Sequence, residues 1–399
     1  MFVSRCDCTL ILPTRNRRAV LDETLGRIAA LPDRRYEVIV LDNGSEDDTP
    51  VLRDRHPSVR WIALGRNLGS AARNVGASAA RGRVLLMLDD DSWPEPGTIE
   101  RAVRLMDDRA DLGAAACRVR LADPPSRHDA GGVPGVFFNC GGVIRRSAFI
   151  EVGGLPIDFQ YYVEEYDLCC RLWRAGWRVE PRGDLLVRHR RSTVNRDNDR
   201  MIRLLVRNNL KLWAKYAPRP HREDLVESAL QRYRRIAGKH GAMAGFRAGL
   251  AQGRAETAGA AESRRLLSPA HLQDLFGLSE ARTVLTRWAQ RFHVRTVAIW
   301  RRGKGCEQVL DLARSIGFRI EAVYDEPDAA DTDRCWRRAP LRDEACFDTT
   351  RVDGIVAGTL SPGVAEDWTA ELSARFPRMP IVSAAPWCLD VTAPRAVAV

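Results

Sequence analysis

The sequence lacks any long, uninterrupted apolar run. No stretch reaches the roughly 18 to 20 uncharged apolar residues that a membrane-spanning helix requires, so no such helix is expected. The N-terminal segment MFVSRCDCTLILPTRN has a short apolar stretch followed by arginines, and it contains no small-residue cleavage site. We interpret this segment as a first β-strand and not as a signal peptide, and we expect the protein in the cytoplasm.

The sequence also has no CxxC pair, although it contains ten cysteines. Cys6 and Cys8 are separated by one residue, and Cys169 and Cys170 are adjacent. Neither spacing suits a disulfide framework or a zinc–thiolate site. We therefore expect the cysteines to be small buried hydrophobic residues in a reducing compartment.

A recognised nucleic-acid-binding module is missing as well, although the chain is basic. The formal net charge is +10, and arginine accounts for most of the excess. This balance favours anionic partners such as nucleotide phosphates, acidic glycans or a membrane surface. Because the basic residues are dispersed along the chain, we predict no nucleic-acid partner. Peripheral contact with the inner membrane face agrees with the charge.

The chain of 399 residues is long enough for two domains and a connector. In the first 190 residues strand signals alternate with helix signals, which predicts an α/β fold with a mostly parallel sheet between helices. Residues 200–290 have an amphipathic helical pattern, and the alternation resumes from residue 294. We predict a first domain over residues 1–217, a helical connector over 218–290 and a smaller C-terminal α/β domain over 291–399.

Acidic clusters follow the expected strands of the first domain. Asp42 ends one strand, and three consecutive aspartates at 89–91 follow the apolar run 84–88. Ligands of such sheets bind at the carboxyl ends of the strands, so these carboxylates indicate a site for a cation or a polar substrate. Between them, a helix of small residues carries Arg73, and its free N–H groups together with this charge favour a phosphate.

A third acidic group opens a later helix, in the segment EEYDLCCRL at 164–172. In chain order, the segments DNGS, RNLG, LDDD, CGG, EEYDLCCRL and GW, followed by a histidine, resemble the inverting family 2 glycosyltransferases of GT-A fold. They are most similar to the rhamnosyl- and galactofuranosyltransferase-like bacterial members. The resemblance runs from about residue 7 to residue 216. It implies a GT-A (nucleotide-diphospho-sugar transferase) Rossmann-like sandwich.

The resemblance also implies a reaction and its partners. A sugar moves from a UDP-, dTDP- or GDP-sugar to an acceptor hydroxyl by direct displacement. The acceptor is a glycan, a lipid-linked molecule or a small molecule. A divalent cation, Mg²⁺ or Mn²⁺, neutralises the leaving diphosphate, and a carboxylate takes the proton of the acceptor hydroxyl.

Each candidate residue receives a role from the same resemblance. The implied donor-binding residues are Pro13, Thr14 and Asn16 at the base, Asp42 at the base or ribose, and Arg73 and Asn74 along the diphosphate. Asp89 and Asp91 form the DxD motif and hold the cation, with His189 as a further ligand. Glu165 stands at the position of the catalytic base. Because Glu165 replaces the family's usual aspartate, Asp167 stays open as an alternative base.

The C-terminal domain has a weaker signal. The segment VAIWRRGKGCEQVL resembles the start of a Rossmann-like unit, with Gly303 and Gly305 as a GxG turn and Asp325 where a ribose-binding acid would stand. Gln308 replaces the third glycine, so we favour a role in packing, homodimer formation or acceptor binding over a working NAD site.

Two alternative functions stay open at this point. A sugar-phosphate nucleotidyltransferase shares the layout of strands and acids, but it needs a glycine-rich loop near the N-terminus that LPTRNRRAV lacks. A non-catalytic nucleotide- or glycan-binding scaffold is the other alternative.

Overall fold

The computed structural model describes residues 6–33, 35–129, 131–192, 197–258, 265–326 and 335–387. Its first part contains β1 (Cys8–Thr14), α1 (Arg18–Ala29), β2 (Tyr36–Asp42), α2 (Leu52–Arg55), β3 (Arg60–Ala63), α3 (Ala72–Ala79), β4 (Val84–Met87), β5 (Ser92–Pro94), α4 (Thr98–Asp108), β6 (Leu112–Leu121), β7 (Gly142–Arg145), α5 (Arg146–Glu151), α6 (Glu164–Arg174) and β8 (Arg178–His189).

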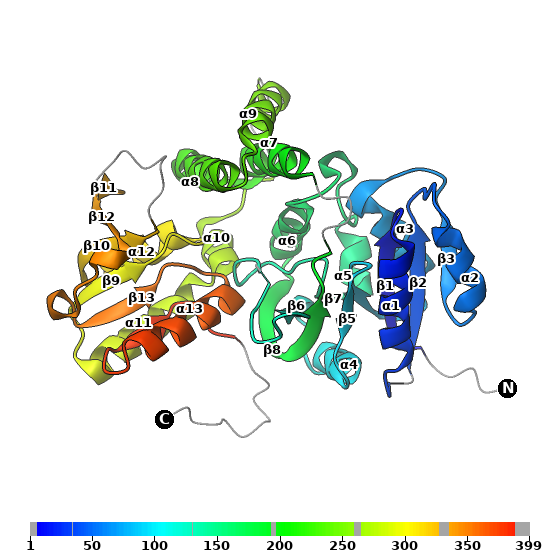
Figure 1. Ribbon diagram of the computed structural model, residues 1–399, viewed down its shortest axis with the longest axis horizontal. Helices are drawn as coiled ribbons and strands as arrows, with labels where there is room; N and C mark the ends of the chain where they lie inside the picture. The colour runs from blue at the N-terminus through cyan, green and yellow to red at the C-terminus, as the bar shows by residue number, and fades with distance from the viewer. Residues whose placement is uncertain are drawn as a thin grey trace.

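The later elements are five helices followed by a second α/β part. They are α7 (Asn198–Tyr216), α8 (Arg219–Lys239), α9 (Met243–Thr257), α10 (Pro269–Phe276), α11 (Leu278–Phe292), β9 (Thr296–Trp300), α12 (Cys306–Ile316), β10 (Arg319–Asp325), β11 (Cys335–Trp336), β12 (Ala339–Asp343), β13 (Gly354–Ala357), α13 (Pro362–Arg375) and β14 (Ile381–Ser383). Figure 1 shows the first sheet on the right, the second on the left, and α7 to α9 at the top between them. The predicted α/β class is confirmed.

The first sheet has the strand order β3-β2-β1-β4-β7-β6-β8-β5. Strands β3, β2, β1 and β4 run parallel, whereas β7 is antiparallel to both of its neighbours and β5 is antiparallel to β8. Strands β6 and β8 are parallel to each other. The sheet is therefore mixed, but six of its eight strands run in one direction, so the predicted mostly parallel sheet is confirmed. No described helix lies between β6 and β7, and a connection without a crossover helix favours antiparallel neighbours.

The parallel half follows directly from its sequence. The apolar runs of β1 and β2 bury Leu10, Ile11, Ile39 and Val40 completely. Such runs are typical of strands that are covered by helices on both faces. These strands hold the polar residues that follow them at one edge of the sheet.

The aspartate segment that follows β4 is held by the end of β8. The short strand β5 pairs with β8 so that Ser92 stands opposite His189. The backbone N–H of Asp89 donates to Ser92 Oγ at 2.8 Å. The chain therefore turns back onto the sheet immediately after the aspartates, and this turn brings them beside His189.

The second sheet has the order β11-β12-β10-β9-β13-β14. Strands β9, β10, β12, β13 and β14 are parallel, and α12 follows β9 through the turn at residues 301–305. One hydrophobic cluster runs through both sheets and the helices between them; its members include Ile11, Leu85, Leu275, Val297 and Val356. Among the described residues, none of the helices combines the length and the apolar character needed to cross a bilayer.

Candidate active site

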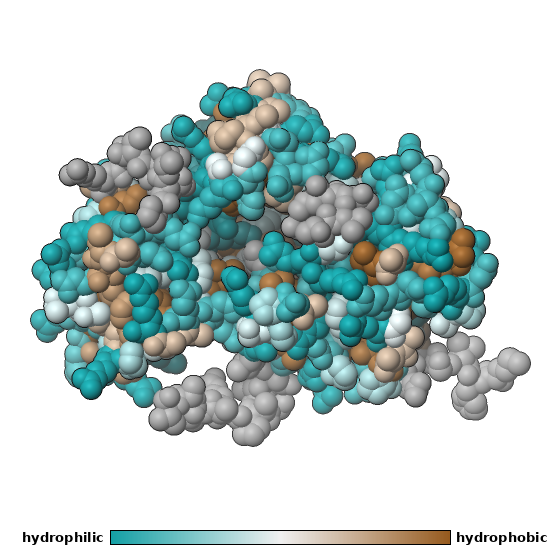
Figure 2. All heavy atoms as spheres, viewed as in Figure 1, coloured by the Kyte–Doolittle hydropathy of each residue, from teal (hydrophilic) through white to brown (hydrophobic). Residues whose placement is uncertain are grey.

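A cleft of about 780 Å³ lies at the carboxyl ends of the parallel strands. Figure 2 shows the molecule hollowed near the middle of this face, beneath the helices at the top. Eight predicted site residues line the cleft, namely Pro13, Thr14, Asn16, Arg73, Asp89, Asp91, Glu165 and His189. These residues come from five separate stretches of the chain, and the fold brings them to one place.

His189 stands between two carboxylates. Its Nε2 lies 3.0 Å from Asp91 Oδ1, and its Nδ1 lies 2.5 Å from Asp129 Oδ2. Asp91 is 3% exposed and also accepts from Arg17 Nη2 at 3.2 Å and from the Ser192 N–H at 2.8 Å. Burial opposes ionisation of Asp91, but His189 and Arg17 outweigh it and lower the pKa of Asp91 to about 2. Asp91 is therefore an ionised, firmly oriented carboxylate.

Asp89 is the open member of the acidic segment. Its side chain is 40% exposed, and its Oδ1 accepts from Arg73 Nη2 at 2.5 Å. Ligand atoms of Asp89, Asp91 and His189 lie within 4.8 Å of one another, and His189 also belongs to a second such group with Asp129 and Cys140. Two carboxylates and one imidazole form a donor set that Mn²⁺ and Mg²⁺ accept. The residues present therefore fit the implied cation.

Asp90 differs from its neighbours because it faces the protein. Its Oδ2 accepts from Thr14 Oγ1 at 2.8 Å, its backbone carbonyl accepts from Thr24 Oγ1 at 2.7 Å, and its Oδ1 is paired with Arg17. Burial raises the pKa of Asp90 to about 7, although Arg17 and Thr14 oppose this shift. Asp90 thus fastens the aspartate segment to β1 and α1.

Glu164 and Glu165 are the first two residues of α6, and both line the cleft. The Asn139 backbone N–H donates to Glu165 Oε1 at 3.3 Å, and Asn139 Nδ2 donates to Glu164 Oε1 at 3.0 Å. Burial raises the pKa of Glu165, and hydrogen bonds from backbone N–H groups and the charge of Arg73 offset part of this rise. Burial and the neighbouring Glu165 raise the pKa of Glu164 well above its ordinary range. A carboxylate with a raised pKa accepts a proton more readily, as a general base must.

Three predicted site residues do not line the cleft. Asp42 Oδ1 accepts from the Ser45 N–H at 2.8 Å and closes the turn after β2. The side-chain amide of Asn74 bonds both the N–H and the carbonyl of Leu155, at 2.8 and 2.9 Å. The structure thus gives Asp42 and Asn74 contacts within the protein itself.

Asp167, the alternative base, also lies away from the cleft. It accepts from Arg171 Nε at 2.8 Å, from Tyr216 OH at 3.0 Å and from Lys215 Nζ at 3.3 Å. Asp167 sits three positions after Glu164 on the same helix, but these partners hold it between α6 and α7. Its surroundings are those of a structural ion pair.

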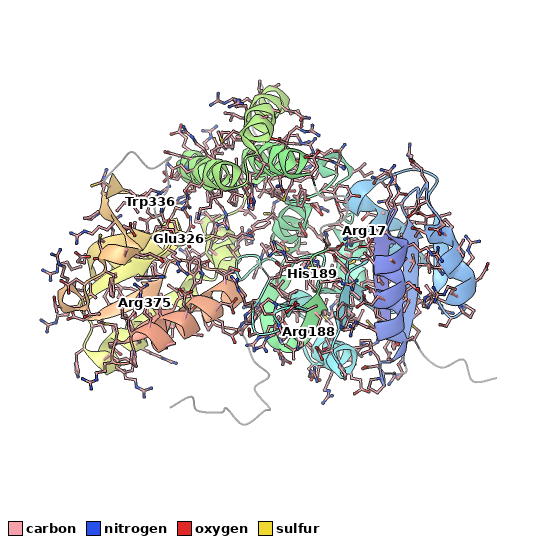
Figure 3. All side chains as sticks on the ribbon, viewed as in Figure 1. Arg17, Arg188, His189, Glu326, Trp336 and Arg375 are labelled. Carbon is pink, nitrogen blue, oxygen red and sulfur yellow. The ribbon has the colours of Figure 1, made fainter. Side chains whose placement is uncertain are left out.

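Sequence reasoning missed several residues that line the cleft. Arg17, at the start of α1, contacts two of the aspartates, and Figure 3 shows it labelled near His189 at the end of β8. Asp129 and Asn139 lie in the long connection between β6 and β7, where no pattern marks a strand or helix. Lys304 arrives from the turn after β9, in the second sheet. Only the basic string RNRR around Arg17 offered a signal.

Part of the chain matches the model of a known protein family. Residues 9–153 match the model of glycosyl transferase family 2. The match covers the four parallel strands, the aspartate segment and Asn139, and it ends before α6. With the sheet order described above, it agrees with a GT-A type fold followed by a second, smaller sheet domain. It does not reach Glu165 or His189, so the roles of these residues stay predictions.

Curated relatives carry related names. The chain is 35% identical over 120 residues to the succinoglycan biosynthesis protein ExoO of Rhizobium meliloti, a match that covers 29% of this chain and 33% of the relative. It is 26% identical over 211 residues to an N-acetylglucosaminyl-diphospho-decaprenol L-rhamnosyltransferase of Mycobacterium tuberculosis, covering 39% and 67%. The chain spans only about a third to three fifths of the length of the first relatives it matches. These names and the family match support the predicted enzyme class, a glycosyltransferase.

Solved structures with some likeness include a mannosyltransferase, PcManGT, from Pyrobaculum calidifontis in complex with GDP-Man and Mn²⁺. It is 21% identical, has a TM-score of 0.44, and the alignment covers 70% of this chain and 81% of that one. S. aureus TarS 1-349 in complex with UDP-GlcNAc is 15% identical with a TM-score of 0.44, covering 57% and 72%.

The Rossmann-like turn of the second sheet is occupied by side chains. Asp325, at the position of a ribose-binding acid, accepts from Arg302 Nε at 2.6 Å and from Arg235 Nη1 at 2.9 Å. Both partners are arginines, so the carboxylate of Asp325 is held in two ion pairs. The preference for packing, homodimer formation or acceptor binding over a working NAD site stays a prediction.

Proposed function

We propose that the protein is a metal-dependent inverting glycosyltransferase that uses a nucleoside-diphosphate sugar. The single observation that carries this proposal is that one cleft contains both a candidate cation-binding cluster and a separate buried glutamate. The Asp89–Asp91–His189 group and Glu165 both line it, and they come from different elements, one from the sheet and one from α6. Departure of a leaving group and attack by a hydroxyl need these two kinds of group in one site.

On the donor side, Asp89, Asp91 and His189 would hold Mg²⁺ or Mn²⁺. A bound cation supplies positive charge that stabilises the negative charge of the departing diphosphate. Arg73 adds a fixed positive charge at the same place, because its guanidinium is buried and already contacts Asp89. Its Nε is buried and has no hydrogen-bond partner among the described residues.

On the acceptor side, Glu165 takes the proton of the attacking hydroxyl. The acceptor oxygen forms a bond to the anomeric carbon while the bond from that carbon to the diphosphate oxygen breaks. The nucleoside diphosphate leaves with the electron pair, and the anomeric configuration inverts. The Asn139 N–H orients the carboxylate of Glu165 for this proton transfer.

Several finer features belong to the same proposal. They are the rhamnosyl- or galactofuranosyl-like subtype, a cytoplasmic location with contact at the inner membrane face, a homodimer, and a glycan, lipid-linked or small-molecule acceptor. The basic charge of +10 supports an anionic partner but does not choose among these acceptors.

A donor screen tests the proposal. Purified protein is heated with UDP-, dTDP- or GDP-sugars, each with Mn²⁺, with Mg²⁺ or with EDTA, and slow donor hydrolysis is followed in parallel. We expect one nucleotide to raise the melting temperature only when metal is present. Stabilisation without metal would contradict the cation site. Stabilisation with metal but no hydrolysis or transfer would favour the scaffold. Conversion of the NDP-sugar and added pyrophosphate to a nucleoside triphosphate and a sugar 1-phosphate would favour a nucleotidyltransferase.

A further inference from the structure

The turn after β9 projects a lysine from the second sheet into the cleft of the first. Gly303 and Gly305 press against Thr359 and Leu360, since a Cβ on either glycine would lie 2.5 to 2.9 Å from those side chains. The Gly303 N–H donates to the Gly358 carbonyl at 2.8 Å, and the Lys304 carbonyl accepts from the Leu360 N–H at 2.7 Å. The GxG pattern therefore builds a tight, fixed turn with Lys304 at its tip.

Lys304 crosses from this turn to the first part of the chain. Its Nζ donates to the Gly131 carbonyl at 2.9 Å and lies over the rings of Phe138, at 4.6 Å, and Tyr166, at 5.6 Å. Its side chain lines the same cleft as Glu165. Burial and the nearby Arg232 disfavour its charged form and lower the pKa of Lys304 to about 7.

Arg232 of α8 supplies a second cation to this end of the cleft. Neither Lys304 nor Arg232 has a carboxylate of the described residues within ion-pair distance, although the charges of Glu165 and Asp129 raise the pKa of Lys304 and so offset part of its lowering by burial and Arg232. Most cations around the cleft are paired, as Arg17 and Arg73 are with the aspartates. Two cations without a carboxylate partner at one end of a substrate cleft fit an anion that arrives with the substrate.

The two cations come from other parts of the chain than the residues predicted to bind the nucleotide. The predicted nucleotide end is formed by residues after β1 and β2, near one edge of the first sheet, whereas Lys304 and Arg232 come from the second sheet and α8. Glu165 lines the cleft between these two ends. Apolar residues line the same cleft, including Leu205 of α7 and Ile236, which follows Arg232 by one turn of α8.

We propose that Lys304 and Arg232 bind a phosphate group of the acceptor, with the apolar residues of α7 and α8 receiving the chain to which that phosphate is attached. The inference rests on the proposed glycosyltransferase function, because it names the acceptor end of that site. It gives the second sheet a direct part in substrate binding. It also makes Lys304 a specificity-determining residue that lies outside the stretch matched by the family model.

The test measures binding of n-decyl phosphate, inorganic phosphate and neutral n-decyl glucoside by calorimetry. The donor side is first filled with the nucleotide from the screen and Mn²⁺. We expect n-decyl phosphate to bind more tightly than either comparison ligand. Loss of one charge-assisted contact in K304M or R232Q should weaken this binding about 10-fold or more, while K304R should retain most of it. R234Q is the matched control, since Arg234 lies on α8, is exposed and does not line the cleft.

The outcomes separate this proposal from the general one. Equal n-decyl phosphate affinity in wild type, K304M and R232Q would overturn it, and so would equal affinity for n-decyl glucoside. Tight binding of inorganic phosphate alone, dependent on Lys304, would support the anion site and assign it to a phosphate without an apolar chain. Failure of the wild-type protein to bind any nucleotide with metal would instead count against the proposed function. Unchanged nucleotide binding in K304M and R232Q shows that both variants are folded.

Discussion

Glu165 and Asp167 lie within one turn of α6, yet their amide variants should have different defects. E165Q should lose transfer activity, and D167N should lose stability. In E165Q the amide oxygen still accepts from the Asn139 N–H, so the local structure is kept while the proton acceptor is lost. Burial already disfavours the Glu165 carboxylate, so E165Q should cost no stability. The transfer rate should fall by about 10²- to 10⁴-fold, the usual contribution of a general base.

In D167N the loss should appear in stability. The amide keeps an oxygen for Tyr216 OH but leaves Arg171 without its carboxylate partner. Removing one member of a buried ion pair costs about 3 to 5 kcal/mol. Because Arg171 and Lys215 are 17% and 28% exposed, water compensates in part, and we expect a loss of about 2 to 3 kcal/mol in the free energy of unfolding.

The assay pairs urea unfolding with transfer rate on the same two preparations. D167N should unfold at lower urea and retain a rate within about tenfold of wild type at a temperature where it is folded. E165Q should unfold with wild-type behaviour and bind nucleotide with metal normally. The reasoning is refuted if D167N is stable but inactive while E165Q stays active, because Asp167 would then be the base.

Three further outcomes follow from the described contacts. D91N should abolish the metal-dependent rise in melting temperature that the nucleotide causes, since a firmly oriented ligand is lost; an unchanged rise would remove Asp91 from the cation site. The transfer rate should fall as the pH drops through the pKa of Glu165, because only the ionised carboxylate takes a proton. Since this pKa is raised, the fall should occur above the ordinary value of 4.5. A pH–rate profile in which the rate falls only below 4.5 contradicts the assignment. G135A should lower the free energy of unfolding by about 1 to 3 kcal/mol in urea titration, as its Cβ would lie 2.7 Å from the Leu275 backbone, while G26A, with open space around it, should be neutral or slightly stabilising; equal effects would argue against this close approach.

Periodicity and residue type predicted the elements of the first half well. Apolar runs marked β1, β2 and β4, and the acidic start of α6 was placed correctly at Glu164. These features depend on neighbours in the chain, and the sequence displays them directly. The direction of β7 was not predictable in this way, because pairing with β4 and β6 depends on a long connection without regular structure.

In the candidate site, the sequence predicted only residues that belong to recognised motifs. Asp91 and His189 were both named from the sequence, but Asp129, which holds the other side of the imidazole, was not. Asn74 was named from the sequence as a donor-binding residue, but its side-chain amide is hydrogen-bonded to the Leu155 backbone. Lys304 was out of reach because nothing local reveals that a turn of the second sheet enters the first cleft.

The shared hydrophobic cluster has a consequence for how the chain can be divided. Side chains from both sheets, such as Ile11 and Val356, belong to one continuous apolar interior that passes through α10 and α11. Cutting the chain after residue 217 would expose the apolar faces that these helices cover, among them the surroundings of Tyr216 and Trp213. We therefore expect that the stretch that matches the family model does not fold by itself, although the other face of the first sheet has a hydrophobic cluster of its own. Heat or urea should melt the two sheets together in one cooperative transition, and expression of the first half alone should yield aggregate.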